Sequence, residues 1–505
     1  MACMGKMPRR FLAAAMFAVS AMAPLAAHAQ VRMTIAINTL GSENWWPQDI
    51  ANNKYLTGTI GDPLVRLVLP YKLEPALASS WKVSDDGLTY AFTIRDDVLF
   101  HDGSKLTAED VAFTLSPENA QNYVGFSRMK NGNLLSVEAK GDCVVIRLKE
   151  VIPFFIDGYI SRISIRPKAY LQRVGPEAFN KAPVGTGPFK LVEHVKSQYV
   201  KMAANDAYFG GRPKVDELVW RVIPEPATRL AMLRKGEVDI TYNELGASTG
   251  ELLRYGMQAV SFGLPRQSVL MFSNLVRKEN LPSRFSDVRV RRALTMAIDR
   301  EAVAKAIYFG KDRAGVLLIV PRETPFLDPK YQPLPFDPKQ AKALLGEAGF
   351  PSGFKVDLYA PSNLKDLAVL VVSYWQRIGV DAKLSLLDPA SLNNAWYNRT
   401  ISGDNIILSQ VLANGVASLV YLDPDAQVVA YASPETDALR REGMAIVDPG
   451  KQDEWFTKVF APRIDQLYPV PVILEGGDGV FGFGPRVKEW SKFEAHAMGF
   501  QWLSP

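Results

Sequence analysis

The sequence contains very little cysteine: its 505 residues include only Cys3 and Cys143. Cys3 lies in an N-terminal stretch that we expect to be removed, so the mature chain would keep one cysteine and form no internal disulfide. Cys143 lies in the apolar run 142–148, which favours a buried structural thiol over a nucleophile. The scarcity of cysteine excludes a disulfide-rich scaffold, so the fold must depend on its hydrophobic core.

Long apolar runs and a strong net charge are also lacking. Beyond residue 29, no stretch reaches the ~18 consecutive apolar residues of a membrane-spanning helix. The chain has 58 Lys and Arg against 53 Asp and Glu, and residues 1–29 hold three of these cations and no acid. The mature chain would therefore carry 55 cations against 53 acids, a net charge of +2. This balance argues against nucleic acid or an anionic membrane surface as a partner.

Histidine is scarce as well. The mature chain would keep His101, His194 and His496, which are far apart in sequence and accompanied by no cysteine pair. Zinc sites are typically built from such residues at short spacing. We therefore predict no metal site and no cofactor, although a metal carried inside a chelating ligand would leave no such pattern.

The N-terminus has the features of an export signal. Three cations within residues 6–10 precede an apolar run at 11–23, which is shorter than the ~20 residues needed to span a bilayer. The pattern Ala27-His28-Ala29 predicts cleavage after Ala29 and release into the periplasm. A twin-arginine signal places a residue between the arginine pair and the following Phe-Leu, so the general secretory route is favoured.

The first part of the mature chain is dominated by strand and turn signals. Residues 31–37 alternate as a strand, and residues 81–94 predict a hairpin around Asp86-Gly87. Residues 144–148 predict a further strand. We expect a mostly antiparallel sheet in this region.

The later part alternates helices and strands. Asp287, Asp299 and Asp337 are each placed to cap a helix, and the third of these helices should end at Gly349. A strand at 354–359, a helix at 364–378 and a strand at 381–387 then form a βαβ pattern. This order predicts a mixed α/β lobe.

Five blocks of sequence carry a family resemblance. They are Glu74–Trp81, Phe100–Val111, Val184–Phe189, Asp287–Leu294 and Asp337–Leu345. Together, and in this order, they closely resemble the family 5 extracellular solute-binding proteins, which are the oligopeptide, dipeptide and nickel receptors of ABC importers.

The resemblance implies an α/β, periplasmic-binding-protein-like clamp of two lobes with an additional third domain, of the class II, peptide-receptor type. By analogy, domain I comprises residues 30–69, 189–273 and 477–505, domain II is the insertion 70–188, and domain III is 274–476. A monomer would close domains I and III around a small organic solute, such as a peptide. Separate permease and ATPase subunits would carry out the import.

The resemblance also directs attention to one loop of domain III. In peptide-binding relatives, an acidic residue that follows a Trp pairs with the peptide ammonium, because an unpaired buried charge is costly. Here Val411 replaces the Trp and Asn414 replaces the acid. Asp423 or Asp425 could occupy the same space. A non-peptide solute such as an opine, an oligosaccharide or an aromatic acid is the alternative.

Other candidate ligand contacts come from their positions in the chain. Asn44, Trp45 and Trp46 follow the first strand, where aromatic platforms would suit sugars or aromatic acids, although a Trp there can equally belong to the core. Arg266 could hold a carboxylate with two hydrogen bonds, or be a solvated surface residue. Tyr421 is a further candidate for the cleft.

Two motifs suggest other functions. Residues 246–250 fit the G-x-S-x-G nucleophile elbow, so a secreted hydrolase using Ser248 with His496 is a rival hypothesis. The alternative is a glycine-bounded loop that caps a helix. Residues 477–482 match G-x-G-x-x-G, but too little chain follows for a dinucleotide-binding unit. A chaperone role for exported chains is a third hypothesis, and we favour a binding protein without catalysis.

Overall fold

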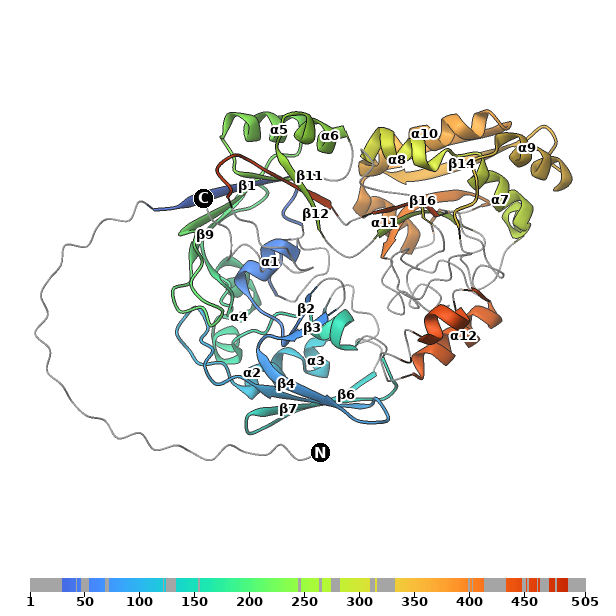
Figure 1. The fold of residues 1–505 in the computed structure, drawn as a ribbon. Coiled ribbons are helices and arrows are strands. Elements are labelled where there is room, and N and C mark those ends of the chain that lie inside the picture. The colour runs from blue at the N-terminus through green and yellow to red at the C-terminus, as the bar shows by residue number, and fades with distance from the viewer. Residues whose placement is uncertain are drawn as a thin grey trace, which may run out of the picture.

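The structure is a computed structural model with two lobes, one coloured blue to green and the other yellow to orange in Figure 1. It describes residues 30–41, 43–46, 54–68, 72–120, 122–123, 133–152, 155–243, 247–262, 266–273, 282–308, 314–315, 332–397, 400–401, 403–412, 433–446, 451, 454–460, 462–463, 472–476 and 479–488.

The first lobe contains a seven-stranded mixed sheet. In spatial order its strands are β12 (Gln258–Phe262), β18 (Gly479–Phe483), β11 (Ile240–Asn243), β1 (Arg32–Ile37), β10 (Glu217–Val222), β9 (Tyr199–Ala204) and β8 (Phe189–Val195). β1 is parallel to β10 and β11, and the other pairs are antiparallel. Helices α5 (Pro226–Lys235) and α6 (Ala247–Arg254) pack on one face, and α1 (Lys54–Ile60) packs on the other (Figure 1).

A four-stranded antiparallel sheet lies at the far end of the same lobe. Its strands, in spatial order, are β4 (Ala78–Val83), β5 (Thr89–Ile94), β7 (Cys143–Leu148) and β6 (Leu134–Lys140). Around it lie α2 (Ala108–Thr114), α3 (Pro117–Ala120), the π-helix η2 (Phe155–Ile160), α4 (Lys168–Lys181) and the hairpin of β2 (Val65–Val68) and β3 (Lys72–Pro75).

The predicted hairpin is confirmed. Val83 pairs with Tyr90 across the turn, and Gly87 has a φ of 67°, which glycine adopts without strain. Cys143 is buried in β7, as its apolar run predicted. In the full-length chain Cys143 is disulfide-bonded. The expectation of a thiol concerns the mature chain, which would lack residues 1–29.

The second lobe is built on a five-stranded mixed sheet. Its strands, in spatial order, are β15 (Val380–Leu387), β14 (Phe354–Pro361), β16 (Ile406–Leu412), β13 (Arg266–Phe272) and β17 (Val472–Gly476). Its described α-helices are α7 (Val288–Met296), α8 (Arg300–Tyr308), α9 (Pro338–Glu347), α10 (Lys365–Gln376), α11 (Pro389–Tyr397) and α12 (Pro434–Met444). Shorter turns are η3 (Arg284–Ser286), η4 (Ser362–Leu364) and the π-helix η6 (Phe456–Phe460).

The local predictions for this lobe are confirmed. The side chains of Asp287, Asp299 and Asp337 each accept a hydrogen bond from a main-chain N–H in the first turn of the following helix, at 2.8–2.9 Å. β14 and β15 are parallel and flank α10, which completes the βαβ unit. Trp375 of α10 is fully buried, and its indole N–H donates to the carbonyl of Leu294 at 3.0 Å.

The chain passes between the two large sheets at two connections, which we call the crossings. Residues 263–265 join β12 to β13, and residues 477–478 join β17 to β18. The strand ends that flank the crossings are paired, Phe262 with Gly479 and Arg266 with Gly476. We expected the domain I segment 189–273 to end after residue 273, and its last strand, β13, pairs with β16 and β17 in the second sheet.

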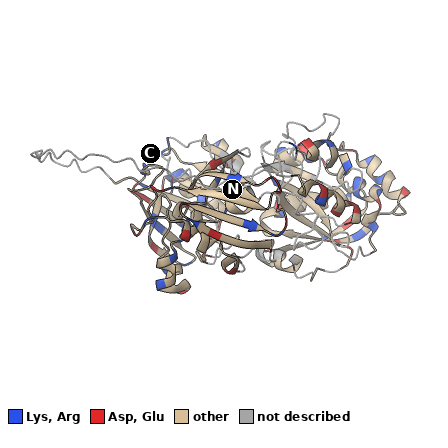
Figure 2. Ribbon diagram, turned by 90° about the horizontal axis from the view of Figure 1, so that it is seen from below, with Lys and Arg blue, Asp and Glu red and all other residues tan. Residues whose placement is uncertain are grey.

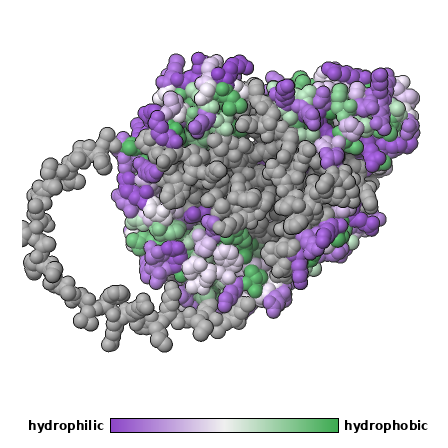
Figure 3. Space-filling model, viewed as in Figure 1, coloured by the Kyte–Doolittle hydropathy of each residue, from purple (hydrophilic) through white to green (hydrophobic). Residues whose placement is uncertain are grey.

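The described surface is polar and of mixed charge. Figure 2 shows Lys and Arg interspersed with Asp and Glu along the described ribbon, and Figure 3 shows mostly hydrophilic residues on the visible helices of both lobes. Among the residues that the structure describes, no helix is long and apolar enough to cross a membrane.

Candidate functional site

The parallel strands of the first sheet end at one common edge. β1 ends at Ile37, β10 at Val222 and β11 at Asn243. In α/β sheets, ligands bind beyond the carboxyl ends of the strands. The β8–β9 turn reaches the same edge, because the Val222 N–H donates to the carbonyl of Gln198 at 2.7 Å. We call residues 38–41 and 43–46, which follow β1 here, the edge loop.

The edge loop carries three of the predicted ligand contacts. Asn44 is exposed, whereas Trp45 and Trp46 are 2% and 7% exposed. The Trp45 ring meets His194 edge-on at 6.3 Å, and the Trp46 ring stacks on Phe113 at 6.0 Å. The expectation of an open aromatic platform is therefore not supported, because packing inside the lobe covers both rings.

A single amide side chain clamps the backbone of the edge loop. The Asn180 Oδ1 atom accepts hydrogen bonds from the N–H groups of Trp45 and Trp46, at 2.6 and 2.8 Å. Its Nδ2 group donates to the carbonyl of Trp46 at 2.6 Å. Asn180 lies near the end of α4, so this helix fixes the position of the loop.

A carboxylate makes the second clamp. The Glu43 side chain, which is 6% exposed, contacts the His194 Nε2 atom at 2.6 Å. It also accepts hydrogen bonds from the N–H and Oγ groups of Ser197 in the β8–β9 turn, at 3.1 and 3.2 Å. These contacts tie the edge loop to β8 and to the β8–β9 turn.

The second lobe contributes Arg266, the first residue of β13. Arg266 is partly exposed, and it pairs with Leu412 at the end of β16 and with Gly476 at the end of β17. It therefore lies beside the crossings between the lobes. The structure brings it next to the strand from which the predicted ligand-binding loop departs.

That loop itself, with Asn414, Tyr421, Asp423 and Asp425, lies outside the described residues. Val411, which replaces the Trp of peptide-binding relatives, is buried in β16.

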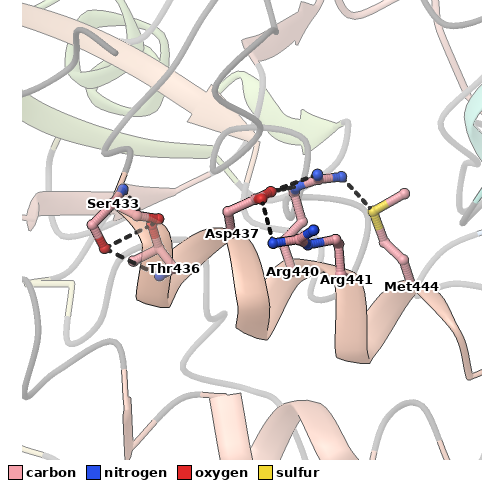
Figure 4. A network of polar contacts seen from close by, with 6 residues as sticks. All are labelled: Ser433, Thr436, Asp437, Arg440, Arg441 and Met444. Carbon is pink, nitrogen blue, oxygen red and sulfur yellow. Dashed lines mark hydrogen bonds and ion pairs between the residues drawn. The ribbon is translucent and has the colours of Figure 1, made fainter. Parts of the chain in front are cut away.

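Helix α12 starts where the described chain resumes after this loop, and contacts within the helix stabilise its first turns. Ser433 and Thr436 form a reciprocal capping box, and Asp437 binds Arg440 at 2.6 Å and Arg441 at 3.0 Å (Figure 4).

Two blocks of the family resemblance, Phe100–Val111 and Val184–Phe189, meet the end of α1 at a contact made of residues 59–62, 101 and 185–187, which we call the signature junction. The Gly185 N–H donates to the His101 Nδ1 atom at 3.4 Å, so the Nε2 atom holds the proton and donates to the Gly187 carbonyl at 2.9 Å. Burial lowers the pKa of His101 from 6.5 to about 4. His101 is therefore neutral at pH 7 and has a structural role.

The same junction buries an acid. The Asp62 carboxylate accepts hydrogen bonds from the hydroxyl groups of Thr186 and Tyr208, both at 2.9 Å, and lies 4.0 Å from Arg66. Burial raises the pKa of Asp62 and outweighs the opposing effects of Arg66 and the two hydroxyl groups. Among the described residues, no group of three or more His, Cys, Asp or Glu side chains is placed to hold a metal ion.

The motifs of the rival hypotheses fall in regular elements. Ser248 is the second residue of α6, which follows β11, while His496 lies outside the described residues. Gly482 lies within β18, where an added Cβ would come within 2.7 Å of Leu252. This glycine therefore allows α6 to pack on the sheet, and β18 forms where a dinucleotide fingerprint requires a turn into a helix.

Comparison with known proteins decides the family. The model of the bacterial extracellular solute-binding proteins, family 5 Middle, matches residues 72–435, well over half of the chain. The chain belongs to this family. The dipeptide-binding protein of Escherichia coli K12 is a relative that is 31% identical over 377 residues, covering 67% of this chain and 69% of its own length.

Solved structures agree on the fold. The periplasmic binding protein DppA of Helicobacter pylori, in complex with the peptide STSA, has a TM-score of 0.77 at 23% identity and covers 94% of this chain and 98% of its own. The binding protein MoaA of A. tumefaciens R10, in complex with mannopinic acid, has a TM-score of 0.74 at 23% identity, with the same coverages. The fold is the two-lobed class II α/β clamp that the resemblance implied.

Glu43, Asn180 and His194 were not identified from the sequence as parts of this site. Their contacts join positions 134–154 residues apart, so no local pattern marks them. The sequence drew attention to His194 only as one of three widely separated histidines that do not predict a metal site.

Proposed function

We propose that this protein is the substrate-binding subunit of an ABC import system. It captures a peptide or peptide-sized organic solute between its two lobes and delivers it to the membrane permease. Asn44 and Arg266 are the described residues that we assign to solute binding, and Asn414, Tyr421 and Asp423 remain candidates.

The paired crossings between the sheets carry this proposal. The strand ends that flank the crossings pair with each other, Phe262 with Gly479 and Arg266 with Gly476, which would let one sheet rotate against the other while the pairing within each sheet is retained. The edge loop and Arg266 lie on opposite sides of these crossings. A solute that contacts both lobes would therefore favour the closed state.

Thermal unfolding of the mature protein against a panel of compounds tests the proposal. The panel holds di- to pentapeptides, opines, sugars and aromatic acids. A true ligand at 100 times its Kd should add ~2.7 kcal/mol to the free energy of unfolding. A decrease in the radius of gyration in solution, produced by the same compound and no other, would confirm closure.

The class of solute follows from which compounds stabilise the protein. Family 5 relatives named for dipeptides and peptides favour a peptide. Asn414 in place of the acidic anchor favours a non-peptide solute, and mannopinic acid, bound by MoaA, is an opine. Loss of binding on acetylation of a peptide's amino group would show that the ammonium is recognised through another acid, such as Asp423 or Asp425.

We propose that the protein has no catalytic activity of its own. The hydrolase hypothesis would replace the receptor hypothesis under two conditions. No compound would stabilise the protein, and the protein would hydrolyse esters with an activity that Ser248→Ala abolishes.

We also propose export to the periplasm as a monomer that works with separate permease and ATPase subunits. N-terminal sequencing of the secreted protein should begin at Gln30, and a membrane-retained form with the intact N-terminus would contradict this.

A further inference from the structure

Two residues in the described chain have an unusual backbone conformation. Glu43 and Ser197 both have a φ of 58°, and no other described residue apart from glycine has a positive φ. Side chains with a Cβ are strained in this region, and such strain persists only where the surroundings enforce it. The two residues are 154 positions apart in sequence, yet they contact each other directly.

The contact is made by the strained residues themselves. The Ser197 N–H donates to both oxygens of the Glu43 carboxylate at 3.1 Å, and the Ser197 hydroxyl donates to Oε1 at 3.2 Å. His194 closes the group through its 2.6 Å contact with Oε2. The unusual backbone conformation thus occurs at both residues that form this contact. We call Glu43, Ser197 and His194 the loop lock.

The loop lock acts on the edge loop immediately before its exposed residue. Asn44 follows Glu43 directly, and Trp45 packs against His194. Asn180 holds the next two N–H groups, so the loop is fixed on both sides of Asn44. A loop held in this way loses little conformational freedom when a ligand binds.

We propose that Glu43 is a positioning residue for solute recognition: through Ser197 and His194 it holds the edge loop in a strained conformation that presents Asn44 to the cleft. This inference rests on the proposed function, because the cleft is where the solute would bind. Glu43 itself is buried and acts through the loop, without touching the solute.

Three variants test this role. Glu43→Ala removes the lock and leaves the strain, so we expect the Kd of the solute identified by the stability panel to rise at least about tenfold. Glu43→Gln keeps an oxygen that accepts from Ser197, and we expect an increase of about threefold or less. Glu193→Ala is the matched control. Glu193 lies on β8, the strand that holds His194, is exposed, and binds only Tyr199 at 2.7 Å among the described contacts.

Hydrogen exchange without solute provides the second readout. The N–H groups of Trp45 and Trp46 should exchange faster in Glu43→Ala than in the wild type, and unchanged exchange would overturn the lock. Faster exchange with an unchanged Kd would overturn the positioning role and leave a purely structural one. If the wild type binds no compound, the proposed function fails and the positioning role with it, while the exchange data still decide whether the lock exists.

Discussion

The signature junction and the edge loop lie in the same lobe but are built in opposite ways. In the junction, main-chain atoms of residues 185–187 lie directly against the end of α1, and the fully buried Asp62 and the partly buried His101 are both hydrogen-bonded. In the edge loop, the backbone is strained, is held by the side chains of Glu43 and Asn180, and leaves Asn44 exposed.

The signature junction contains the sequence blocks by which the family is recognised. The edge loop is where we propose that the ligand is selected. Close main-chain packing tolerates few residue types, so it leaves a recognisable motif in the sequence. A strained loop held by distant side chains can be rebuilt with other residues while the fold is kept. Substitutions in the junction should therefore affect folding, and those at the cleft edge should affect binding.

The largest expected effect is that of Gly187→Ala. An added Cβ would lie 2.5 Å from both the Thr59 oxygen and the Ile60 carbonyl carbon, so the end of α1 must shift. We expect a loss of about 3 kcal/mol or more of unfolding free energy, measured by urea unfolding.

Gly346→Ala is the matched control for Gly187→Ala. Gly346 lies in α9, and an added Cβ there meets only the Pro351 Cα atom, at 4.0 Å. This substitution should stabilise the protein by about 0.5–1 kcal/mol. Equal changes in unfolding free energy for the two substitutions would contradict the idea that close main-chain packing at the signature junction requires glycine.

The second effect is a pH dependence caused by His101. Because its pKa falls from 6.5 in the unfolded chain to about 4 in the folded protein, protons bind the unfolded state first as the pH falls. His101 should therefore cost the fold up to about 3 kcal/mol between pH 7 and pH 4. His101→Gln should flatten this part of the stability curve, and an unchanged slope would contradict the buried neutral imidazole.

The third effect concerns Arg266 at the cleft edge. If it holds a carboxylate of the solute, Arg266→Gln should raise the Kd about tenfold, which is about 1.4 kcal/mol, and leave the unfolding midpoint of the free protein nearly unchanged. Titration calorimetry with the solute and with its amide provides the comparison. An equal loss for both compounds would show that Arg266 does not recognise the carboxylate.

The last effect concerns Asp62, whose pKa is raised. The folded state then takes up a proton before the unfolded state as the pH falls, so this group stabilises the fold at acidic pH. Its contribution to the slope is opposite in sign to that of His101. Asp62→Asn should remove this gain in unfolding free energy at acidic pH, measured by urea unfolding. A larger gain in the variant would contradict the raised pKa of Asp62.

The sequence predicted the elements whose signals are local. The hairpin at Gly87, the caps at Asp287, Asp299 and Asp337, and the βαβ unit all depend on neighbouring residues. β13 lies inside the expected domain I segment 189–273 but pairs with β16 and β17 of the second sheet, a long-range choice that its own residues do not reveal.

The candidate site was predicted less well. Trp45 and Trp46 were recognised as notable residues, but their burial depends on Phe113, Asn180 and His194, which are distant in the sequence. Arg266 begins β13 of the second sheet, and its contact with a solute stays a prediction.

The paired crossings have a consequence for the order of folding. In the first sheet, β18 lies between β11 and β12, so these two strands reach each other only through a strand near the end of the chain. The entire second lobe is synthesised between β12 and β18. The first lobe therefore cannot complete its sheet until residues 479–483 are synthesised. This sheet is completed last, although its first strand is synthesised first. Nascent chains lacking β18 would expose the unpaired edges of β11 and β12, where chaperones or wrong partners can bind.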